Sequence, residues 1–173
     1  MGLRILAFVA MAFLLAASTA AEAKLVIISI NKVSQKMTVS VDGNREYVWP
    51  VSTGTAGYTT PSGKFRPFRM EKEHFSEEWD DAPMPHSIFF TPKGHAIHGS
   101  YYVNSLGRRA SHGCVRLAPD NAAKLFALVQ KAGMQNTTVI VKGGFFELGP
   151  ADLEPPSFRK LKLKRPKWLE NFN

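Results

Sequence analysis

A two-residue turn signal, Asp42-Gly43, separates two runs in which apolar and polar residues alternate. The first run covers residues 36–41, and the second continues through residues 48–51. Alternation with a period of two is typical of a strand with one buried face, and Asp-Gly favours the tight turn of a β-hairpin. Pro50 has no backbone N–H to donate, so it marks an edge strand or the end of a strand. This stretch therefore predicts a pair of antiparallel β-strands.

Further strands are predicted on both sides of this hairpin, together with one helix. Apolar residues recur at helical spacing over Pro119–Ala132, where Pro119 suits a first helical position and Gly133 a C-terminal cap. Residues 71–85 are acidic and have no clean period, which predicts a surface excursion. The remaining strands are predicted at Leu25–Ile30, residues 64–70, two within residues 86–99, and residues 137–143. The predicted fold class is therefore mainly β with one clear helix.

The first 23 residues have the pattern of a signal peptide. Residues 5–17 form an apolar run that is too short to span a bilayer comfortably, a basic residue precedes it, and small residues follow. Cleavage is expected after Ala23, with Ala20 as the alternative site. We therefore expect an exported protein of the periplasm or cell envelope, whose soluble mature domain covers residues 24–145.

The formal net charge of +8 favours an anionic partner, such as a cell-wall polymer, a membrane surface or nucleic acid. Export argues against nucleic acid. Residues 146–173 are predicted to form a basic tail, because residues 155–173 contain six basic residues and one acidic residue. We expect this tail to contact the wall or the membrane. An added edge strand is the alternative, since Leu161 and Leu163 alternate with lysines.

Cys114 is the only cysteine of the chain, so no internal disulfide can form. Either it is a reactive thiol or it is buried as a small apolar residue. A nearby imidazole can take the proton of a thiol, and His112 and His98 are both candidates: His112 is two residues away, and His98 can reach if its strand pairs beside the cysteine segment. Gly113 leaves room for a substrate carbonyl and open N–H groups for an oxyanion, and Arg116 could bind a substrate carboxylate.

A zinc site is an alternative interpretation of the same residues. His95, His98, His112 and Cys114 are residue types that bind zinc. In a strand, however, residues three apart point to opposite faces, so His95 and His98 would not face one metal ion. This weakens the metal hypothesis, and the sequence predicts no metal site.

The segment from Ile97 to Leu117, "IHGSYYVNSLGRRASHGCVRL", resembles the signature of the L,D-transpeptidase catalytic domain of the YkuD type. The motif Ser111-His112-Gly113-Cys114 fits that signature in full, and His98-Gly99 fits its upstream half. Residues 59–65, "TTPSGKF", resemble a second block of the family. The resemblance covers roughly residues 25–143 and implies a mainly β, sandwich-like catalytic domain, with the predicted helix after the cysteine.

The resemblance also implies a role for each matching residue. Cys114 is the nucleophile and His98 the general base and acid, with the backbone carbonyl of Gly99 orienting the imidazole. His112, Gly113 and Cys114 shape the oxyanion site, and Ser111 belongs to the same motif. Many family members have Asn at the position of Arg116, though Arg is also common, so the resemblance supports the carboxylate-binding role of Arg116 less strongly than it supports the pair of Cys114 and His98. His74, His86 and His95 match no catalytic position and are expected to be structural or on the surface.

The implied chemistry is a two-step acyl transfer without a metal or organic cofactor. Cys114 would attack the peptide bond after the third residue of a peptidoglycan tetrapeptide stem, usually a diamino acid, and release D-Ala. An amine would then take the acyl group, which forms a 3→3 cross-link or attaches a protein to the wall. Family members generally form thioesters with carbapenems.

Three alternatives to the transpeptidase stay open. Water as the acceptor would give an L,D-carboxypeptidase, and a closed cleft would give a non-catalytic wall-binding domain. A sortase-like enzyme also uses Cys, His and Arg, but the Thr-Leu-x-Thr pattern that precedes its cysteine is absent from this sequence.

Overall fold

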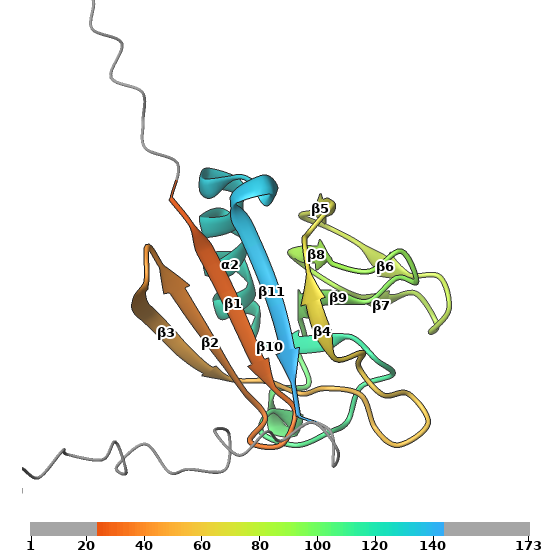
Figure 1. The fold of residues 1–173 in the computed structure, drawn as a ribbon. Helices are drawn as coiled ribbons and strands as arrows, with labels where there is room; N and C mark the ends of the chain where they lie inside the picture. The colour runs from red at the N-terminus through yellow and green to blue at the C-terminus, as the bar shows by residue number, and fades with distance from the viewer. Residues whose placement is uncertain (1–23, 144–173) are drawn as a thin grey trace, which may run out of the picture.

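The computed structural model describes residues 24–143. The predicted signal peptide, residues 1–23, and the predicted tail, residues 146–173, lie outside these residues. Two larger β-sheets, a two-stranded pair and one long helix form most of the described part (Figure 1). No helix within residues 24–143 is long and apolar enough to cross a membrane.

The larger sheet has five strands and contains the predicted hairpin. Its order is β3 (Asn44–Pro50), β2 (Lys36–Val41), β1 (Val26–Asn31), β11 (Thr137–Lys142) and β4 (Gly63–Phe65). β1 pairs antiparallel with β2 and parallel with β11. Asp42 and Gly43 both have positive φ angles, 50° and 83°, as a two-residue hairpin turn of this hand requires. Pro50 is the last residue of β3 and β3 is an edge strand, so both expectations for this proline are confirmed.

The second sheet has four strands and carries the cysteine segment. Its order is β10 (Val115–Leu117), β9 (Ala96–Gly99), β8 (Ser87–Phe89) and β5 (Arg69–Glu71). A separate pair, β6 (Phe75–Ser76) and β7 (Ala82–Pro83), projects from the side of this sheet in Figure 1. The prediction of β8 and β9 as a strand, a turn and a strand is confirmed.

The prediction of one strand over residues 64–70 is wrong. The chain leaves the five-stranded sheet after β4 and enters the four-stranded sheet at β5, so the apolar run is divided between two sheets. Pro67 lies between the two strands, where it has no N–H to give to a ladder. The surface excursion predicted over residues 71–85 contains the β6–β7 pair, which becomes important at the active site.

The helix α2 covers Pro119–Ala132 and confirms the predicted element at both ends. Gly133 follows it with a φ of 88°, and its N–H donates to the carbonyl of Val129. α2 packs against β9 and β8, and two short 3-10 helices, Val103–Ser105 and Met134–Asn136, complete the fold. Together with the observed sheets, this helix confirms the mainly β fold class.

One apolar core joins both sheets to the helix. Alternate residues of β1, namely Val26, Ile28 and Ile30, are fully buried, and each contributes on the order of 1.5–3 kcal/mol to stability. The same cluster contains Ile97 of β9 and Val115 of β10, so the core fixes the two strands on which the cysteine segment depends.

Candidate active site

The parallel pairing of β9 with β10 brings His98 to the cysteine segment. Arg116 of β10 lies opposite His98 of β9, and Val115 lies opposite Ile97. Cys114 immediately precedes Val115, at the start of β10. The strand that carries His98 therefore pairs beside the cysteine segment. This is the arrangement that contact between His98 and the thiol requires.

His98 is buried, and its ring is held by one backbone group. Nδ1 donates a hydrogen bond to the carbonyl oxygen of Gly99 at 2.7 Å, which fixes the proton on Nδ1 and leaves Nε2 as an acceptor. Burial, with a smaller contribution from the positive charge of Arg116, lowers the pKa of His98 to about 4, although the bond to Gly99 opposes this shift. At neutral pH the imidazole is therefore uncharged and can accept a proton.

Cys114 is half-buried and packs against Met84, Phe89 and Ala96. Its Sγ lies 3.8 Å from the carbonyl oxygen of Gly94. Burial raises the pKa of the Cys114 thiol, and the nearby Arg116 opposes this rise only in part. The resting site therefore contains a neutral thiol and a neutral imidazole, not a thiolate–imidazolium pair.

The loop before Cys114 is closed by its own hydrogen bonds. The hydroxyl of Ser111 donates to the carbonyl of Cys114 at 2.5 Å and accepts from the N–H of Gly113 at 3.2 Å. The expectation that the Gly113 N–H is left open is therefore wrong in this state, because Ser111 occupies it. Gly113 has a φ of 117°, and a Cβ added there would lie 3.1 Å from the His95 ring, so both its backbone and its surroundings require glycine.

His112 and Cys114 do not lie in one extended segment. Residues 112–114 form a bend, and the His112 ring lies flat on Trp79, with ring centroids 3.7 Å apart and an interplanar angle of 8°. Tyr58 meets the His112 ring edge-on, with its centroid at 4.9 Å. Trp79 comes from the loop between β6 and β7, so this stack holds that hairpin beside the loop that precedes Cys114.

Arg116 is positioned by a backbone contact. Its guanidinium donates to the carbonyl of Ala110 at 3.0 Å. Within residues 24–143 it forms no ion pair with a carboxylate. Since Arg116 lines the cleft, an anionic group of a ligand could bind to its guanidinium without competing with an internal carboxylate.

A cleft of about 580 Å³ runs past these side chains. It brings together five of the residues singled out from the sequence: His98, Ser111, His112, Cys114 and Arg116. His95 does not line it; its Nδ1 is 2.7 Å from the hydroxyl of Thr91. Among residues 24–143 no group of three or more His, Cys, Asp or Glu side chains is arranged to hold a metal ion.

This arrangement agrees with a comparison against protein families. The family model described as "L,D-transpeptidase catalytic domain" (YkuD) matches residues 25–141. The chain belongs to the L,D-transpeptidase catalytic domain family. The resemblance found in the sequence is thereby confirmed.

Known L,D-transpeptidases resemble the chain in sequence and in fold. A Bacillus subtilis (strain 168) protein described as "Putative L,D-transpeptidase YqjB" is 29% identical over 112 residues, which are 58% of this chain and 64% of that protein. A solved L,D-transpeptidase from Mycobacterium smegmatis is 27% identical with a TM-score of 0.63, over 69% of this chain and 59% of the other. The LD transpeptidase LdtMt1, solved in complex with imipenem, is 26% identical with a TM-score of 0.62, over the same shares. The chain thus spans about 60% of the length of these relatives.

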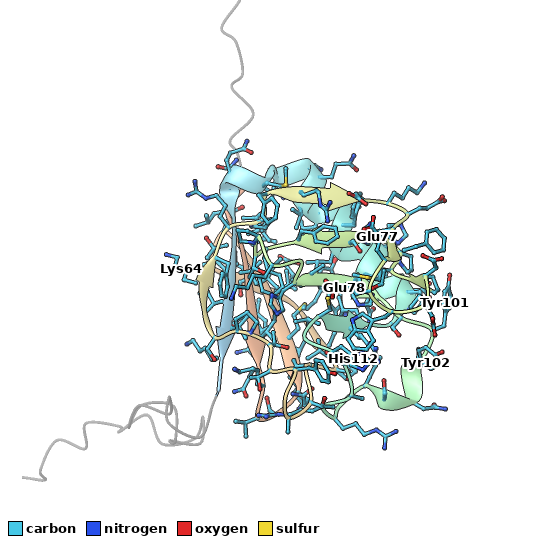
Figure 2. The ribbon with its side chains drawn as sticks, turned by 90° about the vertical axis from the view of Figure 1, so that its right-hand side faces the viewer. Lys64, Glu77, Glu78, Tyr101, Tyr102 and His112 are labelled. Atoms are coloured by element: carbon cyan, nitrogen blue, oxygen red, sulfur yellow. The ribbon has the colours of Figure 1, made fainter. Side chains whose placement is uncertain are left out.

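Two parts of this L,D-transpeptidase domain carry site residues that the sequence did not assign. Thr60, from the "TTPSGKF" block, is buried; its hydroxyl donates to the carbonyl of Gly113 at 2.7 Å and accepts from the N–H of Gly54 at 2.9 Å. The block resembles a family feature, but no sequence pattern around Thr60 indicates its contact with Gly113. No sequence pattern indicates a role for Trp79, because the acidic stretch around it shows no regular spacing of apolar residues. Figure 2 shows the face on which His112, Glu78, Tyr101 and Tyr102 gather.

Proposed function

We propose that the chain is a peptidoglycan L,D-transpeptidase that uses Cys114 as its nucleophile. One observation carries the proposal: His98, with its tautomer fixed by Gly99, and Cys114 line the same cleft, because β9 pairs in parallel with the strand that begins directly after Cys114. A base that is uncharged at neutral pH can accept the thiol proton at the moment of attack. Membership of the family supports the same reaction class.

In the first step, Sγ of Cys114 forms a bond to the carbonyl carbon of the third stem residue while its proton passes to Nε2 of His98. The carbonyl electrons move to the oxygen. When they return, the bond to the nitrogen of D-Ala breaks, and His98 gives its proton to that leaving amine. The product is a thioester on Cys114, with a neutral imidazole restored.

In the second step, an amine attacks the thioester carbonyl. His98 accepts the proton of the attacking amine and returns it to the sulfur as the thioester bond breaks. The new amide is a 3→3 cross-link or the attachment of a protein to the wall. Water in place of the amine would make the domain an L,D-carboxypeptidase.

The oxyanion of the intermediate needs donors that are fixed before the reaction. We assign this role to the backbone N–H of Cys114, with the Gly113 N–H available only if it releases Ser111. Ser111 and Thr60 hold this loop from opposite sides through its carbonyl groups. Arg116 would bind a free carboxylate of the stem near the scissile bond.

The proposed setting follows from the reaction. Peptidoglycan lies outside the cytoplasmic membrane, which agrees with the signal peptide predicted at residues 1–23 and gives a location in the periplasm or cell envelope. The basic tail at residues 146–173 would hold the domain near anionic wall polymers or lipid head groups.

Mass spectrometry of the full chain tests the proposal. Incubation with imipenem should add one drug mass to the wild-type protein and none to Cys114→Ala. Incubation with purified tetrapeptide stems should release D-Ala and give either a dimer, if an amine is the acceptor, or a tripeptide, if water is. An unmodified wild-type protein with intact stems would show that the domain binds the wall without acting on it.

A further inference from the structure

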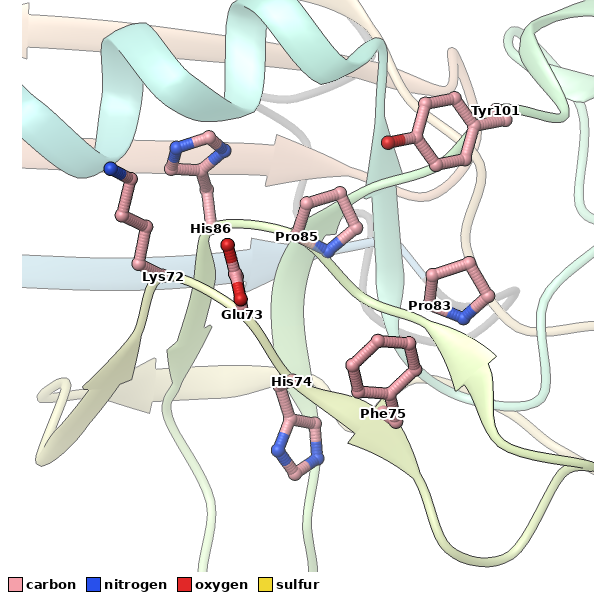
Figure 3. Close-up of a pocket in the computed structure, with 8 residues that line it drawn as sticks. All are labelled: Lys72, Glu73, His74, Phe75, Pro83, Pro85, His86 and Tyr101. Atoms are coloured by element: carbon pink, nitrogen blue, oxygen red, sulfur yellow. The ribbon is translucent and has the colours of Figure 1, made fainter.

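A second pocket adjoins the catalytic cleft and shares two of its walls, Pro83 and Tyr101. Its volume is about 340 Å³. It lies between the segment that follows β5, the segment that leads from β7 to β8, and the loop after β9, as Figure 3 shows. No step of the proposed reaction uses it. Its lining consists of Lys72, Glu73, His74, Phe75, Pro83, Pro85, His86 and Tyr101.

Large aromatic side chains at this pocket are exposed to solvent. Phe75 is 56% exposed and Tyr101 is 68% exposed, and the next residue, Tyr102, is exposed as well and lines the cleft. Neighbouring exposed apolar groups of this size usually mark a ligand-binding surface on a globular protein. In Figure 3 Phe75 and Tyr101 lie on either side of Pro83, so the exposed rings continue from the pocket toward the cleft.

The backbone that carries these rings is fixed. The N–H of Ser100 donates to the carbonyl of Leu117 in β10 at 2.8 Å, and the hydroxyl of Ser105 donates to the carbonyl of Tyr102 at 2.7 Å. Phe75 lies in β6, where it pairs with Pro83 of β7. A ligand that stacks on these rings would therefore lose little free energy in ordering the backbone.

The opposite side of the pocket is polar. Lys72 and Glu73 contribute a cation and a carboxylate, and the N–H of His86 donates to the carbonyl of Lys72 at 2.8 Å, which joins the two segments. Nδ1 of His86 is buried and has no hydrogen-bond partner within residues 24–143. Its φ of 56° is uncommon for a residue with a side chain. The His86 ring packs against Phe126 of α2, so the polar side chains open to a ligand on this side are those of Lys72 and Glu73.

We propose that this pocket binds an amino sugar of the glycan strand to which the substrate's peptide stem is attached. Sugar rings have apolar C–H faces, which pack on aromatic rings, and hydroxyl groups at their edges, which need donors and acceptors. Phe75 and Tyr101 supply the first, and the exposed side chains of Lys72 and Glu73 supply the second. The volume lies at the lower end of the ~300–1,000 Å³ typical of small-molecule pockets, which suits a small ring system better than a whole stem.

Substrate geometry agrees with this assignment, which here rests on the proposed function. The carbonyl that Cys114 would attack belongs to the third residue of the stem, and the sugar is joined to the first. Three extended residues span about 10 Å. This reach is consistent with a stem that lies in the cleft and carries its sugar into the adjoining pocket, which shares Pro83 and Tyr101 with the cleft.

Direct binding tests the site without any reaction. The Cys114→Ala full chain is titrated with an N-acetylglucosamine tetramer and followed by calorimetry. We expect saturable binding that Tyr101→Ala and Phe75→Ala each weaken about fivefold and that Tyr101→Phe preserves. Phe68→Ala is the matched control, since Phe68 is 52% exposed and lines neither pocket. Absence of saturable binding, or an equal loss in Phe68→Ala, would overturn the assignment.

Kinetics separate this site from the reaction. The quantity compared is the ratio of kcat/KM for a disaccharide-tetrapeptide to kcat/KM for the free tetrapeptide. We expect a ratio well above one for the wild type, which Tyr101→Ala brings toward one; a wild-type ratio of one contradicts the sugar site. If neither substrate reacts while the tetramer still binds, the transpeptidase proposal fails and the titration supports the sugar site by itself.

Discussion

Trp79 lies flat on His112, with ring centroids 3.7 Å apart, and joins the β6–β7 hairpin to the catalytic loop. We expect Trp79→Ala to lower kcat/KM about tenfold, because the hairpin wall of the cleft loses its attachment; aromatic pairs contribute roughly 0.5–1.5 kcal/mol. Trp79→Phe should retain most of the activity. Steady-state kinetics on tetrapeptide stems measure both.

Tyr47→Ala is the control for this substitution. Tyr47 stacks on Trp49 at 4.6 Å and has the same exposed fraction as Trp79, 38%, but it lies on the edge strand β3. Its loss should leave kcat/KM unchanged. If both variants lose activity equally, the stack on His112 has no special role.

The pH dependence of activity should reflect the buried His98. Because burial lowers its pKa from an ordinary 6.5 to about 4, His98 stays a base well below neutral pH. The acidic limb of kcat/KM should therefore fall near pH 4. A limb centred near pH 6.5 would assign the base to an exposed histidine.

Stability should also depend on His98. Between pH 6.5 and about 4 the unfolded chain binds a proton that the folded chain does not, so the free energy of unfolding falls as the pH falls through this window. The loss reaches about 3 kcal/mol below pH 4. Urea unfolding at several pH values measures this loss. In His98→Asn the free energy of unfolding should depend much less on pH. A smaller dependence should remain, because burial also lowers the pKa of His95.

The raised pKa of Cys114 predicts slow alkylation at neutral pH. The rate with iodoacetamide should increase with pH beyond the range of an ordinary thiol, since only the thiolate reacts. Arg116 stabilises the thiolate, so Arg116→Ala should shift this profile to still higher pH, whereas Arg116→Lys should preserve it. An unchanged profile in Arg116→Ala would remove the electrostatic link between the two residues.

Gly113 should tolerate no side chain. Gly113→Ala combines a positive φ with a Cβ 3.1 Å from the His95 ring, and we expect it to cost more than the ~1 kcal/mol of the backbone effect alone. Gly107→Ala isolates that backbone effect, because Gly107 has a φ of 90° and nothing within 4 Å of an added Cβ. Urea unfolding of both variants compares them; equal losses would show that the His95 contact is harmless.

The elements that could be predicted from the sequence are those that local interactions determine. The Asp42-Gly43 hairpin and the helix at Pro119–Ala132 carry their own turn and cap residues, so neighbours along the chain were sufficient. The division of residues 64–70 between two sheets was missed, because each half pairs with a strand distant in sequence. β10 could not be predicted for a different reason: a strand of three residues is too short to show a periodicity.

The candidate site also combines residues that the sequence identifies with contacts that only the folded structure defines. Cys114 and His98 stand out by residue type and motif, and their pairing required only that two strands be neighbours. The partner of His112 could not be foreseen, because Trp79 reaches it through a tertiary contact from an acidic stretch. Likewise, the occupation of the Gly113 N–H by Ser111 depends on a bend that only the folded loop defines.

The parallel pairing of β1 with β11 has a consequence for the order of folding. β1, the first strand of the described residues, lies between β2 and β11, the last strand of the described residues, with Val26 opposite Thr137. During synthesis β1 has its hairpin partner early but lacks its second neighbour until the end of the domain has emerged. Contacts of such sequence separation form slowly. One side of β1 therefore stays without a partner until residues 137–142 have been synthesised, and the five-stranded sheet cannot be completed before then.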